Sequence, residues 1–116
     1  MERHRALERR RQLVQLAPTI PEIQELHGLV LYRLGRWREA ITHLETFREL
    51  SGTAEQNHVL ADAYRALRRW TDVEELWDEL RAVSPNAEVV NEGRIVVAGS
   101  YADRGDLPGA IRLLEK

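Results

Sequence analysis

The sequence predicts an all-α protein, built as a solenoid of stacked antiparallel helix hairpins. Apolar residues recur at 3.6-residue spacing along most of the chain, which is typical of helices that bury one face. Similar segments return after 33 and then 37 residues, and a spacing in this range indicates repeated helical hairpins. No stretch alternates with a period of two, so we expect no β-sheet.

Composition limits the class of protein. The chain has 116 residues, of which 43% are apolar and 31% are charged, and these values are typical of one globular domain. The absence of cysteine excludes disulfides, thiolate metal sites and a cysteine nucleophile. No apolar run reaches the roughly 18 residues of a membrane span, so we expect a cytoplasmic protein with no membrane partner. Lysine occurs only once, and we interpret this arginine bias as the mark of a GC-rich, bacterial genome.

Three segments align as equivalent parts of one repeat. Trp37 falls on Trp70 at the first offset, and Gly35 falls on Gly105 after both offsets. Each aligned segment lies between two apolar-periodic stretches, as the turn of a helical hairpin does. The expected elements of this single domain are a lone helix over residues 1–18 and hairpins over residues 20–52, 53–85 and 86–116.

Capping residues indicate where the helices begin and end. Thr19, Thr53 and Thr71 each precede a Glu or Gln by three residues, which is the spacing of a capping box. The third hairpin carries the four extra residues of the longer offset near its start. We therefore predict that its first helix is about one turn longer and that Asn86 is its N-cap. The glycines expected to end helices in a left-handed conformation are Gly35, Gly52 and Gly105.

In this register the chain resembles the tetratricopeptide repeat family, whose tandem helix–turn–helix units have about thirty-four residues. The family places a small residue where the two helices cross and a bulky residue one turn later. The small residues here are Gly28, Ala61 and Ala98, and the bulky ones are Leu31, Tyr64 and Tyr101. The signature Trp of the first helix is replaced by Gln24, Asn57 and Arg94. The resemblance implies a right-handed solenoid.

The resemblance also implies a non-catalytic module that binds a peptide or a partner protein in a concave groove lined by the first helices. The groove-facing positions carried onto this sequence are Glu25, Leu29, Tyr32 and Arg33, then Glu55, His58, Asp62 and Arg65, then Ile95, Gly99, Ala102 and Asp103. One subset of the family grips a C-terminal carboxylate with a Lys/Asn clamp, and that clamp is absent here. A groove of mixed charge predicts a ligand with both charges and an apolar anchor.

Two alternative functions stay open. Ile111 and Leu114 give the last helix an apolar face with no capping helix after it, so we expect self-association. The first alternative is therefore a homo-oligomerising structural array. The second is an RNA-associated adaptor that contacts phosphate through Arg3, Arg5, Arg9, Arg10 and Arg11. A solvated helix face explains those arginines more simply, so nucleic acid is not the expected partner.

No constellation of residues indicates catalysis. The four histidines lack the spacing of helical metal-ligand pairs, and we interpret His27 as a core residue with a hydrogen-bonded ring nitrogen. Carboxylate pairs such as Glu74 and Glu75 are expected on the solvated faces of amphipathic helices. We therefore expect a protein that is not an enzyme and has no metal or cofactor.

Overall fold

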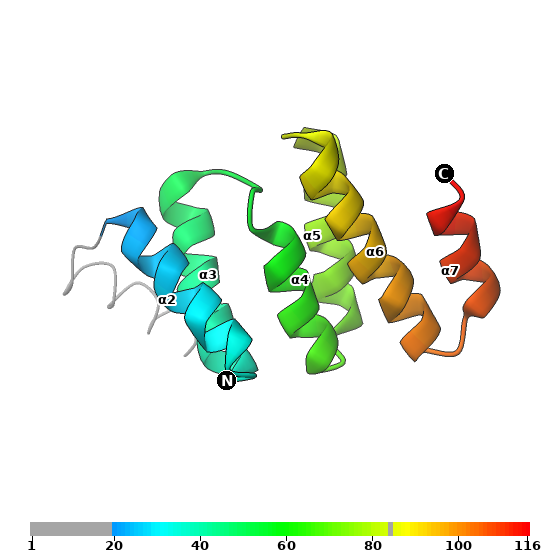
Figure 1. Cartoon of the computed structure of the whole chain (residues 1–116), viewed down its shortest axis with the longest axis horizontal. Coiled ribbons are helices and arrows are strands. Elements are labelled where there is room, and N and C mark those ends of the chain that lie inside the picture. The colour runs from blue at the N-terminus through cyan, green and yellow to red at the C-terminus, as the bar shows by residue number, and fades with distance from the viewer. Residues whose placement is uncertain (1–19, 84) are drawn as a thin grey trace. The chain divides into compact units, whose positions relative to one another are not determined.

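The computed structural model describes residues 20–83 and 85–116, and these residues form six α-helices and no β-strand (Figure 1). The helices are α2 (Pro21–Arg33), α3 (Trp37–Ser51), α4 (Asn57–Ala66), α5 (Trp70–Val83), α6 (Ala87–Asp103) and α7 (Leu107–Leu114). The chain divides into two compact units, Met1–Gly52 and Thr53–Lys116. The lone helix expected over residues 1–18 lies outside the described residues.

In the first unit, α2 packs against α3 across a close crossing. Gly28 lies at this crossing, and a Cβ atom there would lie 2.6 Å from Cγ of Leu44. Leu44 and Ala40 on α3 are fully buried. The small residue therefore allows the two helix backbones to approach, as the repeat pattern predicts.

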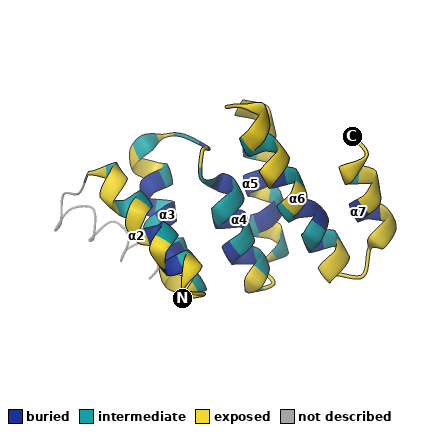
Figure 2. Ribbon diagram, in the orientation of Figure 1, coloured by how far each residue is buried: buried dark blue, intermediate teal, exposed yellow. Residues whose placement is uncertain are grey.

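In the second unit, α4 packs against α5 and α6, α5 also contacts α6, and α7 packs against α6. Buried positions lie on the facing sides of these helices (Figure 2). Ala61 and Ala98, the counterparts of Gly28, are both buried. The most deeply buried aliphatic side chains of this core are Leu60, Val73, Leu80 and Val97.

The three turns between paired helices have the same backbone hydrogen bonds, with N···O distances of 2.8 to 3.0 Å. In the first turn, the amides of Gly35 and Arg36 donate to the carbonyls of Tyr32 and Leu31. In the second, Arg68 and Arg69 donate to Arg65 and Tyr64. In the third, Gly105 and Asp106 donate to Ala102 and Tyr101. The residue that donates first in each turn has a positive φ. In two turns this residue is a glycine, which adopts a positive φ without steric cost, but in the second turn it is Arg68, with a φ of 60°.

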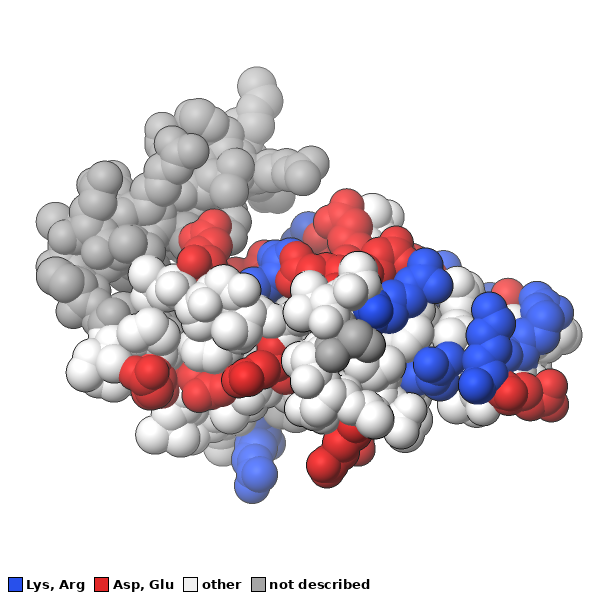
Figure 3. All heavy atoms as spheres, turned by 90° about the horizontal axis from the view of Figure 1, so that it is seen from above, with Lys and Arg blue, Asp and Glu red and all other residues white. Residues whose placement is uncertain are grey.

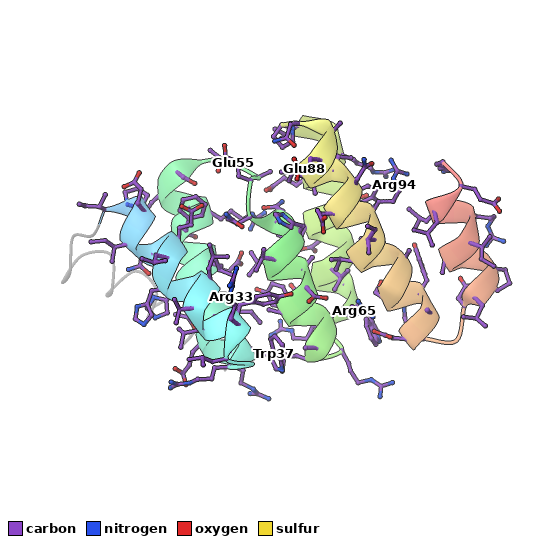
Figure 4. The ribbon with its side chains drawn as sticks, in the orientation of Figure 1. Arg33, Trp37, Glu55, Arg65, Glu88 and Arg94 are labelled. Carbon is purple, nitrogen blue, oxygen red and sulfur yellow. The ribbon has the colours of Figure 1, made fainter. Side chains whose placement is uncertain are left out.

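A polar link between the two helices of each hairpin repeats with the same offsets. It starts from the side chain that replaces the signature Trp and reaches the residue 19 positions later. Gln24 Oε1 accepts from His43 Nδ1 at 2.7 Å, Asn57 Nδ2 donates to the Leu76 carbonyl at 3.1 Å, and Arg94 Nη1 donates to the Leu113 carbonyl at 3.4 Å. Arg94 accordingly extends from α6 towards α7 (Figure 4). Three different residue types thus form an equivalent hydrogen bond between the two helices of a hairpin.

The predicted capping boxes at Thr53 and Thr71 are wrong. The chain first makes a turn in which the Asn57 amide donates to the Ala54 carbonyl at 3.1 Å, so α4 begins four residues after Thr53. Thr71 is the second residue of α5, because the shared turn ends at Arg69 and the helix starts immediately afterwards. Thr19 lies outside the described residues.

The other predictions about helix ends are confirmed. The Asn86 side chain accepts a hydrogen bond from the Val89 amide at 2.9 Å, which makes it the N-cap of α6. The helix has 17 residues, compared with 13 in α2, which is about one turn more, and 10 in α4, which is about two turns more. The three glycines expected to be left-handed, Gly35, Gly52 and Gly105, all have positive φ.

The apolar pattern of α2 is buried on one side only. Gly28 and Leu31 are the buried residues of this helix. A row of large apolar side chains on another side of α2 exposes between 47% and 64% of each residue, and we call it the α2 stripe: Ile23, Leu26, Val30 and Leu34. His27 is exposed as well, so its interpretation as a core residue is wrong.

Candidate interaction surface

The groove residues expected from the resemblance fall on α2, α4 and α6, with one exception. Glu55 lies in the turn before α4, because that helix begins only at Asn57. Those of α2 belong to the first unit, and those of α4 and α6 belong to the second. In the second unit the structure brings four of them together, and we call this group the Arg65 cluster: Asp62, Arg65, Gly99 and Asp103.

The Arg65 guanidinium joins α4 to α6. Its Nε donates to Asp103 Oδ2 at 2.6 Å, and its Nη2 donates to Asp103 Oδ1 at 3.3 Å. Asp62, one turn earlier on α4, accepts from Nη1 at 3.5 Å. Gly99 leaves room for this fork, since a Cβ there would lie 2.5 Å from Nη1. The glycine on α6 is therefore part of how the cluster is built.

The charges of the cluster stabilise one another. The hydrogen bond from Arg65 holds the pKa of Asp103 below its ordinary value, and desolvation acts in the opposite direction. The same hydrogen bond raises the pKa of Arg65. Both side chains remain partly exposed, so the bidentate pair contributes about 1 kcal/mol or less to folding. Its greater effect is to fix the positions of charged groups that a ligand would meet.

His58 and Ile95 are equivalent positions on α4 and α6, one repeat apart. His58 is half-buried, and this burial lowers the pKa of its imidazole, while the negative charge of Glu92 acts in the opposite direction. Ile95 is an exposed apolar side chain. The predicted groove positions of this unit therefore supply an apolar contact as well as charges. Ala102, the last predicted position, is exposed.

The predicted groove positions of the first unit all lie on one helix, α2. Tyr32 packs edge-on against Trp37, with ring centroids 5.6 Å apart, so its ring supports the first hairpin. Arg33, the last residue of α2, is exposed (Figure 4). Glu25 and Leu29 are half-buried.

A histidine pair in the first unit was missed from the sequence. The ring of His27 stacks on that of His43, with centroids 3.9 Å apart and planes inclined by 27°. Burial lowers the pKa of His43, and the nearby charge of His27 lowers it further. The repeat alignment carried a usable signal, because His27 stands where the other two hairpins have the apolar residues Leu60 and Val97.

Arg104 was also missed, and it connects the end of α6 to α5. Its Nη2 donates to Glu74 Oε1 at 3.2 Å. Its guanidinium carbon lies 4.4 Å from the centroid of the Tyr101 ring and 5.4 Å from that of Trp70. Burial, followed by a hydrogen bond with Glu74, raises the pKa of Tyr101. Glu74 thus has a structural partner instead of lying on a purely solvated face.

A metal site, a membrane span and a phosphate contact were also considered. Among residues 20–83 and 85–116, no three His, Cys, Asp or Glu side chains gather as metal ligands do. No helix in this part of the chain is both long and apolar enough to cross a membrane. The arginines considered for phosphate contact, Arg3, Arg5, Arg9, Arg10 and Arg11, lie outside the described residues.

Comparisons were made with known protein families, with curated proteins and with solved structures, and none of the three yields a match to this chain.

Proposed function

We propose that this chain is a non-catalytic protein-interaction domain with the right-handed solenoid architecture of tetratricopeptide repeats. Three turns with identical hydrogen bonds support the repeat, and so do three polar links of 19-residue separation. Small buried residues at the helix crossings supply the packing that such repeats need. The α4–α6–α5 packing of the second unit is the expected contact between consecutive hairpins.

The ligand of this domain is a peptide segment or partner surface that lies across α4 and α6. The observation that carries this proposal is the Arg65 cluster, which sets charged groups from two first helices side by side at a partly exposed surface. The exposed side chain of Ile95 adds an apolar contact on α6. Both helices therefore contribute directly to one surface, as a groove of stacked first helices requires.

Local charge favours a basic ligand over an acidic one. Charged side chains of both signs lie on the face seen in Figure 3, so selection depends on local groups rather than on the net charge of −2. Around the cluster and the neighbouring His58, three carboxylates accompany two guanidinium groups: Asp62, Glu92 and Asp103, with Arg65 and Arg68. The carboxylates outnumber the guanidinium groups, so the net charge of this group of side chains is negative. A segment with Lys or Arg beside an apolar residue fits this surface.

The proposal is tested with synthetic 12-residue peptides of three classes, in which a central Leu is flanked by basic, acidic or uncharged residues. The basic class is expected to bind the 116-residue chain best, with an affinity that falls as salt is added. Amide resonances of α4 and α6 are expected to shift in NMR spectra on titration. Failure of all three classes to bind, or a preference for the acidic class, contradicts the proposal.

Neutralisation of one carboxylate locates the binding surface. Asp103→Asn is expected to weaken the basic peptide several-fold, because an exposed charge contributes about 1 kcal/mol to such a contact. Asp78→Asn is the matched control, since Asp78 also pairs with an arginine, Arg81, at 2.9 Å but lies on the second helix α5. An equal loss in both variants means that the peptide responds only to net charge.

A further inference from the structure

Two helices of the molecule present apolar rows that neighbouring described residues leave exposed. The α2 stripe is one of them, and the second, the α7 stripe, consists of Leu107, Ile111 and Leu114. Members of the α7 stripe expose between 53% and 60% of each residue. Single exposed Leu or Ile side chains are ordinary, but rows at helical spacing are typical of a face that packs against another helix.

An internal contact of the second unit shows what such faces do. The second helix α5 of one hairpin packs against the first helix α6 of the next. Gly93 of α6 lies against Trp77 and Leu80 of α5. At the other end of this contact, Arg104 pairs with Glu74.

The repeat offsets relate the residues on each side of the α5–α6 contact to the residues of one stripe. One offset of 37 residues takes Trp70, Glu74 and Trp77 of α5 to Leu107, Ile111 and Leu114, which are the whole α7 stripe. The combined offset of 70 residues takes Gly93 and Arg104 of α6 to Ile23 and Leu34 of the α2 stripe. The α7 stripe is therefore a surface for a first helix, and the α2 stripe is a surface for a second helix.

The residues of the two stripes differ from the internal contact in matched pairs. The internal ion pair of Glu74 and Arg104 corresponds to the apolar pair of Ile111 and Leu34. A change on one side alone would leave a partly exposed charge opposite an apolar side chain, without its counter-ion.

Side-chain volume is matched in the same way. The large Trp77 lies against Gly93 inside the unit, whereas the corresponding pair, Leu114 and Ile23, consists of two residues of intermediate size. Close packing requires such a compensated exchange, because an enlarged residue on one side needs a reduced one opposite.

We propose that the α7 stripe of one copy docks on the α2 stripe of a second copy and reproduces the α5–α6 contact between molecules. The two stripes are different surfaces, so this association is head to tail. Each copy in a dimer keeps one free stripe, and assembly therefore continues beyond two copies.

The chain's own residues 1–18 match the α2 stripe less well. At the 33-residue spacing, Arg11 and Glu8 take the places that Leu114 and Ile111 hold in α7. Packing them against Ile23 and Leu34 would remove charged groups from water opposite apolar partners. Residue chemistry therefore favours a second copy as the occupant.

The mass of the 116-residue chain, measured by sedimentation velocity, tests this assembly. We expect the mass to rise past that of a dimer between about one and a few hundred micromolar, the range of a small interface. Leu34→Arg and Ile111→Glu are each expected to remain monomeric throughout this range. The double variant is expected to regain association, because its two introduced charges meet between copies as Arg104 and Glu74 meet within one.

A mixing experiment separates head-to-tail contacts from symmetric ones. Leu34→Glu and Ile111→Glu, combined in equal amounts, are expected to form a dimer that stops growing, because each retains the stripe that the other has lost and the two remaining stripes carry like charges. If Leu34→Arg alone keeps the wild-type mass, or if Ile111→Glu alone does, the contact is symmetric or lies elsewhere, and the proposal is wrong.

Controls exclude unfolding and a different occupant. Leu34 and Ile111 are exposed, so helicity by circular dichroism is expected to stay unchanged in their variants. Val83→Glu places the same charge on an exposed apolar residue outside both stripes, and its mass is expected to match that of the wild type. A wild-type protein that is monomeric at every concentration overturns the proposal. If Leu13→Glu then induces association, residues 1–18 are the occupant instead.

Discussion

The hairpin of α2 and α3 and the hairpin of α6 and α7 have the same turn and the same polar link, yet their first helices differ in what they bury. On α6, Gly93, Val97 and Ser100 are buried. The equivalent residues of α2 are Ile23, His27 and Val30, and all three are exposed. The repeat thus determines the structure inside each hairpin, whereas burial of the outer face depends on whether another helix lies against it.

Residue size follows the same division. The covered face of α6 has small residues at Gly93 and Ser100, while α2 has large ones at the same places. We expect Gly93→Ile, which installs the residue of α2, to lower the free energy of unfolding by about 3 kcal/mol. The added side chain would collide with Leu80 and Trp77 of α5. Urea unfolding followed by circular dichroism measures the change.

The reciprocal substitution sharpens the comparison. Ile23→Gly removes an exposed side chain, so we expect a loss of only about 1 kcal/mol, which comes from the low helix propensity of glycine. If Gly93→Ile and Ile23→Gly lower the free energy of unfolding equally, the outer faces of α2 and α6 have similar surroundings. The proposed difference between a covered face on α6 and an exposed face on α2 would then be wrong.

The polar links differ in burial, and their removal is expected to have unequal effects. Asn57 is buried and also donates to Glu79 Oε1 at 2.9 Å, whereas Gln24 is only half-buried. We expect Asn57→Ala to cost about 2 kcal/mol and Gln24→Ala about 0.5 kcal/mol in thermal unfolding. A larger loss of stability for Gln24→Ala than for Asn57→Ala would show that burial of the linking side chain does not determine how much each link stabilises the fold.

Sequence patterns predicted the parts of the fold that depend on short-range physics. Helix spacing, the small residues at crossings, the positive φ of Gly35 and the cap at Asn86 all depend on neighbours within one hairpin. The errors concern relations beyond that range. His27 is exposed, although its apolar surroundings in the sequence suggested a core position, because periodicity cannot show whether a neighbour covers a face. Thr53 matched a capping box but precedes a turn.

The candidate site was predictable only as a set of positions. The resemblance supplied Arg65, Gly99 and Asp103 as groove-facing residues, but the sequence could not show that Arg65 is held by two carboxylates. Side-chain pairing across helices depends on a separation of 38 residues along the chain, for which no local pattern exists. The proposed preference for a basic ligand therefore rests on the structure and not on the sequence.

The turns offer a stabilising substitution. Arg68 has a φ of 60°, where Gly35 and Gly105 stand in the other two turns. We expect Arg68→Gly to raise the free energy of unfolding by about 0.5 to 1 kcal/mol, because glycine adopts this conformation without steric cost. The gain is limited by loss of the contact between Arg68 and the Trp70 ring, at 5.9 Å. A destabilised Arg68→Gly variant would show that this contact outweighs the backbone strain.

The smallest effect concerns the histidine pair, which has no counterpart in the second unit because Leu60 and Leu76 occupy the equivalent places. The pKa of His43 lies below its ordinary 6.5, so its contribution to stability is present above pH 6.5 and is lost as the pH falls through the folded-state value. We expect His27→Gln to raise the pKa of His43 in an NMR titration, because a neighbouring positive charge is removed. The value should stay below 6.5, since burial is the larger cause. His58→Gln, in the other unit, should leave the His43 titration unchanged, and a His43 pKa that does not respond to His27→Gln would assign the whole shift to burial.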